Sequence, residues 1–101
     1  MLLFKITQKN NLAPDTWHGA IVAAESPDVA RQIHPGTQPG NSSSMVWSPE
    51  RNGWLYADEV NDADAYCVDD WAPPHLVAVT LIGVAVGDTL PGVILSSYRS
   101  D

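Results

Sequence analysis

Large apolar side chains recur at every second position in several short stretches of this 101-residue chain. In the first stretch, LLFKIT, Leu2, Phe4 and Ile6 alternate with Leu3, Lys5 and Thr7, which is the pattern of a half-buried β-strand. Alternation, β-branched runs and turn residues together predict strands at Leu2–Thr7, His18–Glu25, Met45–Pro49, Trp54–Asp58 and Leu76–Val86, and they allow a sixth at Val93–Tyr98.

A helix is predicted to follow the second strand. Ser26 can cap its first turn, and Pro27 loses nothing at the first helical position because its missing N–H would have no partner there. Pro35 ends the helix, which gives it the range Pro27–His34 and about two turns. An isolated helix of this length is unstable in water, so it must pack on a sheet. Its apolar stripe consists of Val29, Ala30 and Ile33.

These elements predict an α+β fold with a single antiparallel sheet of about five to six strands and one short helix packed on one face. Asn52 and Gly53 are expected to supply the positive φ angles of a tight hairpin turn. The run Leu76–Val86 is the most apolar in the chain, so we expect it at the centre of the sheet or against a partner subunit. No repeat or long linker divides the chain, and residues 1–101 are expected to form one domain.

Charge bears on function more than on fold. The chain has 12 acidic and 5 basic side chains, a formal net charge of −7 and a pI near 4.5. This balance opposes binding to phosphate backbones and favours basic partners, so direct nucleic-acid binding is not expected. A single cysteine cannot form an internal disulfide, and no signal peptide or membrane-spanning run is recognised. We therefore expect a cytoplasmic protein without a membrane partner.

No residue pattern predicts a catalytic centre, a metal site or a cofactor. The side chains that such a site would use are His18, His34, Cys67 and His75. They share none of the spacings typical of metal ligands. Asp62 and Asp64 resemble the start of a calcium-binding loop, but a tyrosine and a cysteine stand where a third oxygen ligand and the turn glycine belong. The expectation is a protein that is not an enzyme and holds no cofactor.

Tryptophan is unusually frequent for a chain of this length. The four residues are Trp17, Trp47, Trp54 and Trp71, all in predicted loops or on the shoulders of the hairpin. Two interpretations remain open. Two or three of them cover the sheet, or one or two form a contact patch, because tryptophan is enriched at binding hot spots and stacks on nucleobases.

Three blocks of sequence, Ala23–Pro35, Trp71–Ala85 and Gly92–Tyr98, carry a resemblance. Together they resemble a widespread group of small, uncharacterised bacteriophage and prophage proteins that share an A-E-S-x-x-x-A-x-x-I-H-P block and a closing G-V-x-x-x-S-F or S-Y block. The resemblance carries no catalytic motif. It implies a phage accessory protein, and such proteins commonly disable a host defence.

The first functional hypothesis is a small non-enzymatic inhibitor that binds a bacterial anti-phage defence protein. Its acidic surface would mimic nucleic acid and meet the lysine or arginine side chains that normally hold phosphates, as in some anti-CRISPR proteins. Tryptophans would anchor the contact. The predicted binding residues are Asp58, Glu59, Asp62, Asp64, Asp69, Asp70, Trp47 and Trp54. The alternative is that these carboxylates only keep the protein soluble.

The second hypothesis is an oligomeric sponge that sequesters a nucleotide immune signal, such as a cyclic oligonucleotide or an ADP-ribose derivative. Tryptophan would stack on the base, arginine would meet the phosphates, and a homo-oligomer could gather one arginine from each subunit. The predicted ligand-binding residues are Arg31, His34, Arg51, Arg99 and Trp71. An enzyme that degrades such a signal is a third class, for which only scattered histidines are available.

Overall fold

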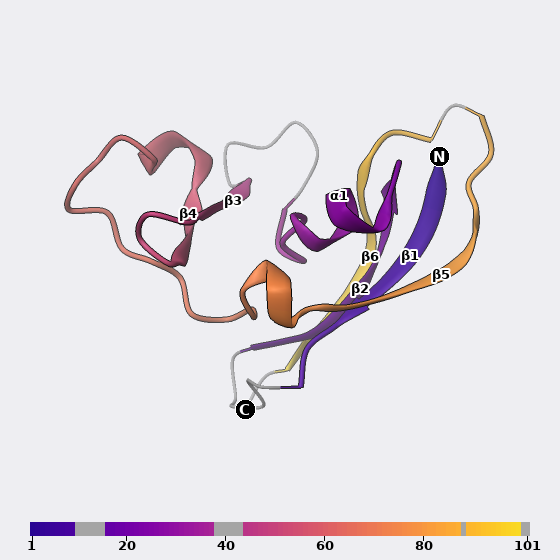
Figure 1. Ribbon diagram of the computed structural model, residues 1–101, viewed down its shortest axis with the longest axis horizontal. Coiled ribbons are helices and arrows are strands. Elements are labelled where there is room, and N and C mark those ends of the chain that lie inside the picture. The colour runs from indigo at the N-terminus through magenta and orange to yellow at the C-terminus, as the bar shows by residue number, and fades with distance from the viewer. Residues whose placement is uncertain (10–15, 38–43, 88, 100–101) are drawn as a thin grey trace.

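The computed structural model describes residues 1–9, 16–37, 44–87 and 89–99, with side chains as far as Ser96. It is a small α+β fold with a four-stranded antiparallel sheet, a separate two-stranded hairpin and one short helix that contacts the sheet (Figure 1). The elements, with η for a turn of 3-10 helix, are β1 Leu2–Thr7, β2 Thr16–Ala24, α1 Pro27–Arg31, β3 Met45–Ser48, β4 Gly53–Tyr56, η1 Ala57–Glu59, η2 Pro74–Leu76, β5 Ala78–Val84 and β6 Gly92–Arg99.

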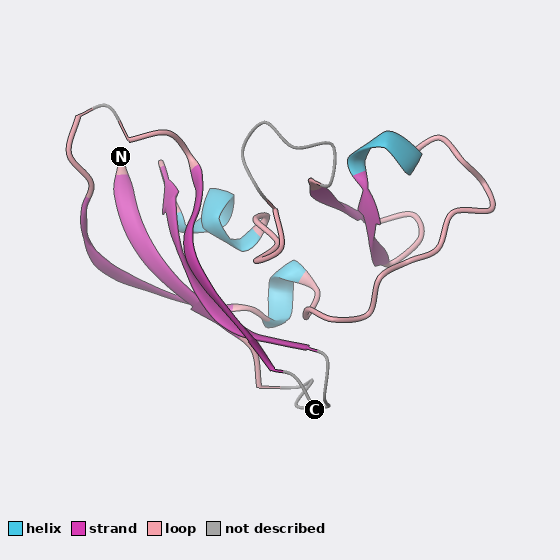
Figure 2. Ribbon diagram, turned by 180° about the vertical axis from the view of Figure 1, so that it is seen from behind, coloured by secondary structure: helices cyan, strands magenta, loops and turns pink. Residues whose placement is uncertain are grey.

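β1 and β2 form the centre of the main sheet, whose strand order is β5-β1-β2-β6 with all neighbours antiparallel. Their period-two pattern places Phe4 opposite Val22 and Ile6 opposite Ala20, and all four side chains are buried. Trp54 of the hairpin belongs to the same core cluster. The helices and the hairpin therefore lie on one side of the sheet (Figure 2), and the core fills the space between them.

The prediction that residues 45–49 and 54–58 belong to the main sheet is wrong. β3 pairs only with β4, and the two strands form a sheet of their own. The chain reaches them after α1 and so lies on the covered side of the main sheet (Figure 1), and both edges of that sheet are formed by the later strands β5 and β6. The hairpin contributes buried side chains, Trp54 and Leu55 among them, but its strands do not pair with the strands of the main sheet.

The prediction that Leu76–Val86 is a central strand is also wrong. β5 lies at an edge, because β1 pairs on its other side with β2 and the last strand, β6, takes the far edge of β2. Val79 packs against the core, but Val84 is 73% exposed. The apolar run therefore predicts a strand correctly here, but it does not show that the strand is buried.

The cap of α1 follows the prediction, although the helix is shorter than expected. Ser26 Oγ accepts a hydrogen bond from the Val29 N–H at 3.3 Å, and the helix ends at Arg31 instead of His34. Within the apolar stripe, Ala30 is fully buried and Ile33 packs partly against the core, whereas Val29 is exposed. In the described part of the chain no helix is long and apolar enough to cross a membrane.

The hairpin turn uses Asn52 and Gly53 in different ways from the prediction. Asn52 has the positive φ angle, 52°, and Gly53 does not. A Cβ atom on Gly53 would lie 2.7 Å from Cys67 Sγ and 2.8 Å from Cys67 Cβ, so the glycine is needed for this close approach. The contact lets the segment after η1 cross directly beside β4, where Trp54 forms an isolated bridge with Val68.

Candidate functional site

The best-defined polar cluster joins His34, Asp70 and Trp17. His34 Nε2 lies 2.7 Å from Asp70 Oδ1, and Trp17 Nε1–H donates to Asp70 Oδ2 at 3.1 Å. On the other side of the imidazole the Gly36 N–H donates to His34 Nδ1 at 2.9 Å. His34 is 1% exposed. Both ring nitrogens of His34 and both carboxylate oxygens of Asp70 therefore have partners inside the protein.

The hydrogen bond from the Gly36 N–H shows which ring nitrogen of His34 carries the proton. Because it is a donor, Nδ1 must accept and carries no proton, so the proton sits on Nε2 and is donated to the Asp70 carboxylate. A neutral imidazole with both nitrogens engaged is not available to bind a phosphate or to remove a proton from a substrate. These contacts contradict the predictions that His34 meets a ligand phosphate and that Asp70 belongs to an exposed binding face.

The cluster has a structural consequence. The Trp17 N–H donates to the Asp70 carbonyl at 3.1 Å, and Gln8 Nε2 donates to the Trp17 carbonyl at 2.9 Å. Asp70 thus ties the segment that follows the hairpin to the ends of β1 and β2. The hairpin side of the molecule is held on the sheet by these bonds as well as by apolar packing.

The remaining predicted carboxylates lie on η1 and the segment after it, residues 57–69, called here the acidic loop. Asp58, Asp62 and Asp64 are exposed and Glu59 is half-buried. In the described part of the chain none of these four forms an ion pair. Asp62 Oδ1 accepts a hydrogen bond from the Asp64 N–H at 2.9 Å, and Asp69 is exposed at the end of the loop.

Arg51 gives the acidic loop its shape. Its Nη1–H donates to the Asp62 carbonyl at 2.9 Å, and its Nη2–H donates to the Ala65 carbonyl at 2.6 Å. The guanidinium is thereby committed to the backbone of the loop. Arg51 was predicted to bind a ligand phosphate, but its guanidinium donates to the backbone of the acidic loop instead.

The four tryptophans divide between core and surface. Trp54 is 1% exposed and donates from Nε1 to the Ala72 carbonyl at 3.0 Å, and Trp71 is 2% exposed. Neither can anchor a partner or stack on a ligand in this conformation, which contradicts both predictions. Trp47 is only half-buried and contacts Trp54 edge to face, with ring centroids 5.4 Å apart. Trp17 is half-buried beside His34, so Trp47 is the better placed for an external contact.

Trp47 lines a recess between α1, β3 and η2, called here the arginine recess, with a volume of about 430 Å³. The other lining residues are Arg31, Gln32, Pro49, Pro74 and His75. Arg31 Nη1–H donates to the Val77 carbonyl at 2.9 Å, which fixes the guanidinium beside the recess. The structure thus brings Arg31 and a tryptophan together, as the sponge hypothesis requires. It adds His75, which no sequence motif indicated.

The other candidates do not converge on one place. The side chain of Arg99 lies outside the described residues, and Cys67 is half-buried behind the hairpin turn. Among the described residues no three His, Cys, Asp or Glu side chains gather as a metal ion would require. His18 is exposed on β2 and lines a different hollow.

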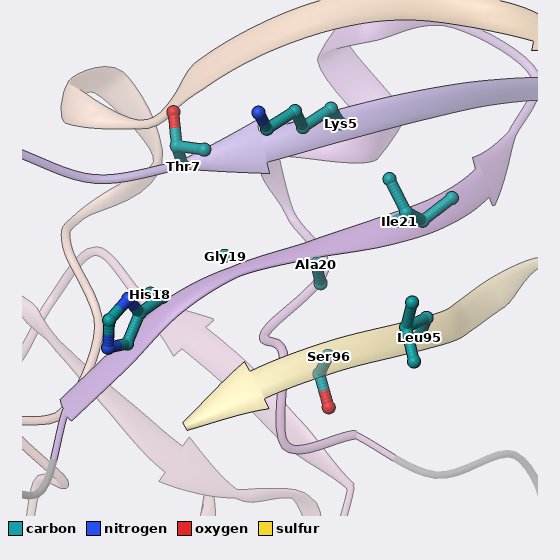
Figure 3. A pocket seen from close by; sticks show the side chains of 8 residues that line it. All are labelled: Lys5, Thr7, His18, Gly19, Ala20, Ile21, Leu95 and Ser96. Atoms are coloured by element: carbon teal, nitrogen blue, oxygen red, sulfur yellow. The ribbon is translucent and has the colours of Figure 1, made fainter. Parts of the chain in front are cut away.

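That hollow, called here the sheet hollow, lies on the main sheet and measures about 370 Å³. Figure 3 shows Lys5 and Thr7 of β1 above Gly19 and Ile21 of β2, with Leu95 on the next strand. Gly19 has no side chain to fill the space. No sequence motif indicates this hollow, because it depends on which strands are neighbours in the sheet.

Residues of the A-E-S-x-x-x-A-x-x-I-H-P block have structural roles in this fold. Ser26 caps α1, Ala30 is buried beneath it, and His34 holds Asp70. Comparisons of the chain with protein-family models, with curated proteins and with solved structures found no match. Function is therefore inferred below from the surfaces and recesses of this chain.

Proposed function

We propose that the protein is a small non-enzymatic inhibitor that acts in the bacterial cytoplasm by binding a component of an anti-phage defence. The single observation that carries the proposal is the acidic loop, in which the carboxylates of Asp58, Glu59, Asp62 and Asp64 form no ion pair with the described part of the chain. Their charge is left for the cations of a partner. The net charge of −7 and the resemblance to phage proteins give further support.

The contacts of Arg51 support binding by a preformed surface. The loop backbone is fixed at Asp62 and Ala65, so less conformational entropy is lost when a partner binds. A site that normally holds nucleic-acid phosphates presents lysine and arginine side chains, which pair well with carboxylates. Asp58, Glu59, Asp62 and Asp64 would meet these cations, and the half-exposed Trp47 would provide an apolar contact on the hairpin.

Bacterial strains that each carry one nucleic-acid-targeting defence system provide the test. Expression of the protein should restore phage plaques on at least one strain. Asp62→Asn combined with Asp64→Asn should weaken binding to the purified target on the order of 30-fold, because each lost charge pair costs ~1 kcal/mol. Asparagine keeps the oxygen that accepts the Asp64 N–H, so the loop should stay folded.

Glu25→Gln combined with Asp28→Asn is the matched control, since it removes two charges from exposed positions around the start of α1. This variant should restore plaques as well as the wild type does. Plaque counts that stay unchanged on every strain would overturn the proposal. Equal loss of activity in both double variants would show that net charge, and not the acidic loop, matters.

A second function, sequestration of a nucleotide signal, is favoured by the arginine recess. Trp47 offers an aromatic face, Pro49 and Pro74 add apolar walls, and Arg31 and His75 supply N–H donors for a phosphate. Arg31 uses one of its nitrogens on Val77, so donors remain for a ligand. The recess is therefore suited to a flat ring that carries an anionic group.

Calorimetric titration with cyclic dinucleotides, cyclic trinucleotides and ADP-ribose derivatives separates this function from the first. A sponge should release or absorb heat with one of these ligands in the absence of any protein partner. Arg31→Gln should then lower the affinity by about tenfold, equal to one charge-assisted hydrogen bond. Lys5→Gln removes a positive charge outside the recess and should leave the affinity unchanged. Flat titrations across the panel would exclude this function.

A further inference from the structure

One face of the main sheet carries no helix or hairpin in the described part of the chain (Figures 1 and 2). Because Phe4 and Ile6 point into the core, the alternate residues of β1 and their partners on β2 point the other way. This open face contains Leu3, Lys5 and Thr7 of β1, Gly19 and Ile21 of β2, and Leu95 of β6. It is more apolar than a solvated sheet face, which normally carries polar side chains.

In the described part of the chain, charge is distributed unevenly between the main sheet and the rest of the molecule. None of β1, β2, β5 and β6 contains an Asp or Glu residue, so the carboxylates that make the net charge −7 lie outside the sheet. Two copies of such a protein repel one another over most of their surface. Among the described residues, the open face is where that repulsion is smallest.

The open face has both a projection and a depression. Leu95 is 67% exposed on β6, and the sheet hollow lies beside it with Gly19 on its floor (Figure 3). A two-fold axis through this face would let Leu95 of each copy enter the hollow of the other, because a two-fold interface uses the same surface patch on both subunits. The contact would cover Ile21 and the aliphatic part of Lys5 in both copies.

We propose that the open face binds a second copy of this chain in a two-fold symmetric dimer. Four strands at ~4.8 Å spacing and about seven residues at ~3.3 Å give the face roughly 400 Å² of plan area. Standard interfaces bury about 800 Å² on each partner, so we expect a weak, reversible dimer with a dissociation constant in the micromolar range. The acidic loops lie on the opposite side of each subunit and stay exposed, so the proposal does not depend on the inhibitor function.

Sedimentation velocity from about 1 µM to about 500 µM tests the dimer. The mass of the wild type should rise from 10.9 kDa towards twice that value with concentration. Leu95→Lys should raise the dissociation constant at least about tenfold, because it brings a second cation towards the partner's Lys5. Leu76→Lys, an exposed leucine of η2 on the covered side, is the matched control and should dimerise like the wild type.

Salt provides a measurement that does not depend on a variant. Raising sodium chloride from about 0.1 M to about 0.5 M should leave an apolar dimer as stable or slightly more stable, whereas a dimer held by the acidic loop would dissociate. A constant mass of 10.9 kDa over the whole concentration range would overturn the proposal. So would a Leu95→Lys protein that dimerises as well as the wild type.

Discussion

Asp70→Asn should lower the free energy of unfolding by about 3 kcal/mol and the melting temperature by about 12 to 24 °C. The Asp70 carboxylate accepts from two donors, His34 Nε2–H through Oδ1 and Trp17 Nε1–H through Oδ2. An asparagine has the same size but only one side-chain oxygen. Its NH₂ group must therefore face one of the two donors, which leaves that N–H without an acceptor. Thermal unfolding followed by circular dichroism measures the loss.

Asp58→Asn is the control, because this exposed carboxylate forms no ion pair in the described part of the chain, and it should change the stability by less than about 0.5 kcal/mol. A double-mutant cycle with Trp17→Phe identifies the cause. Phenylalanine removes one of the two donors, so Asp70→Asn should cost less in that background. Equal melting temperatures for wild type and Asp70→Asn would contradict the assigned hydrogen bonds and the structural role of His34.

The elements that depend on local sequence were predicted well. β1 has the range expected from its alternation, and the cap of α1 follows from the hydroxyl of Ser26 next to Pro27. The hairpin was expected from Asn52 and Gly53 between two tryptophans and is formed by β3 and β4. In each case the cause lies within a few residues of its effect, so pattern and turn chemistry are sufficient.

The order of the strands could not be predicted in the same way. β5 and β6 carry exposed leucine, isoleucine and valine, and apolarity on both faces of β5 was interpreted as central burial. Strand order is decided by pairings between distant segments, which the local pattern does not encode. If the open face is covered by a second copy, part of this apolarity serves the dimer and not the core of one chain.

The contacts of the candidate site could not be predicted either, because they join residues that are far apart in the sequence. His34 and Asp70 are 36 residues apart, and each belongs to a different one of the two functional hypotheses. The fold brings them together as one hydrogen-bonded pair, with His34 buried and Asp70 half-buried, so neither side chain is an exposed binding residue. Asp58, Asp62 and Asp64 of the acidic loop are exposed as predicted, because carboxylates without a cationic partner are rarely buried, although Ala65 and Val68 of the same loop pack inward. The arginine recess joins Arg31 to Trp47 from separate elements, and no spacing rule indicates such a meeting.

Gly19→Ala should lower the free energy of unfolding by about 2 to 3 kcal/mol, which corresponds to a fall in melting temperature of about 8 to 24 °C. A Cβ atom at this position would lie 2.6 Å from the carbonyl oxygen of Ile6 and 3.1 Å from Thr7 Cγ2. The first neighbour is backbone of the central strand β1, one residue before Thr7, which is the residue that pairs with Gly19. It can move away only if β1 and β2 separate locally, and Ile6 is fully buried in the core on the other face.

Gly83→Ala is the matched control on the same sheet, since the nearest atom to its Cβ would be Leu3 Cδ1 at 4.0 Å. Alanine restricts the unfolded chain more than glycine does, so this variant should be neutral or more stable by up to about 1 kcal/mol. Both proteins should be melted near 1 µM, below the expected range of dimer formation, so that the monomer fold alone is compared. Equal melting temperatures for the two variants would mean that β1 accommodates a methyl group at Gly19. The close pairing of the two central strands would then not be the reason for a glycine at this position.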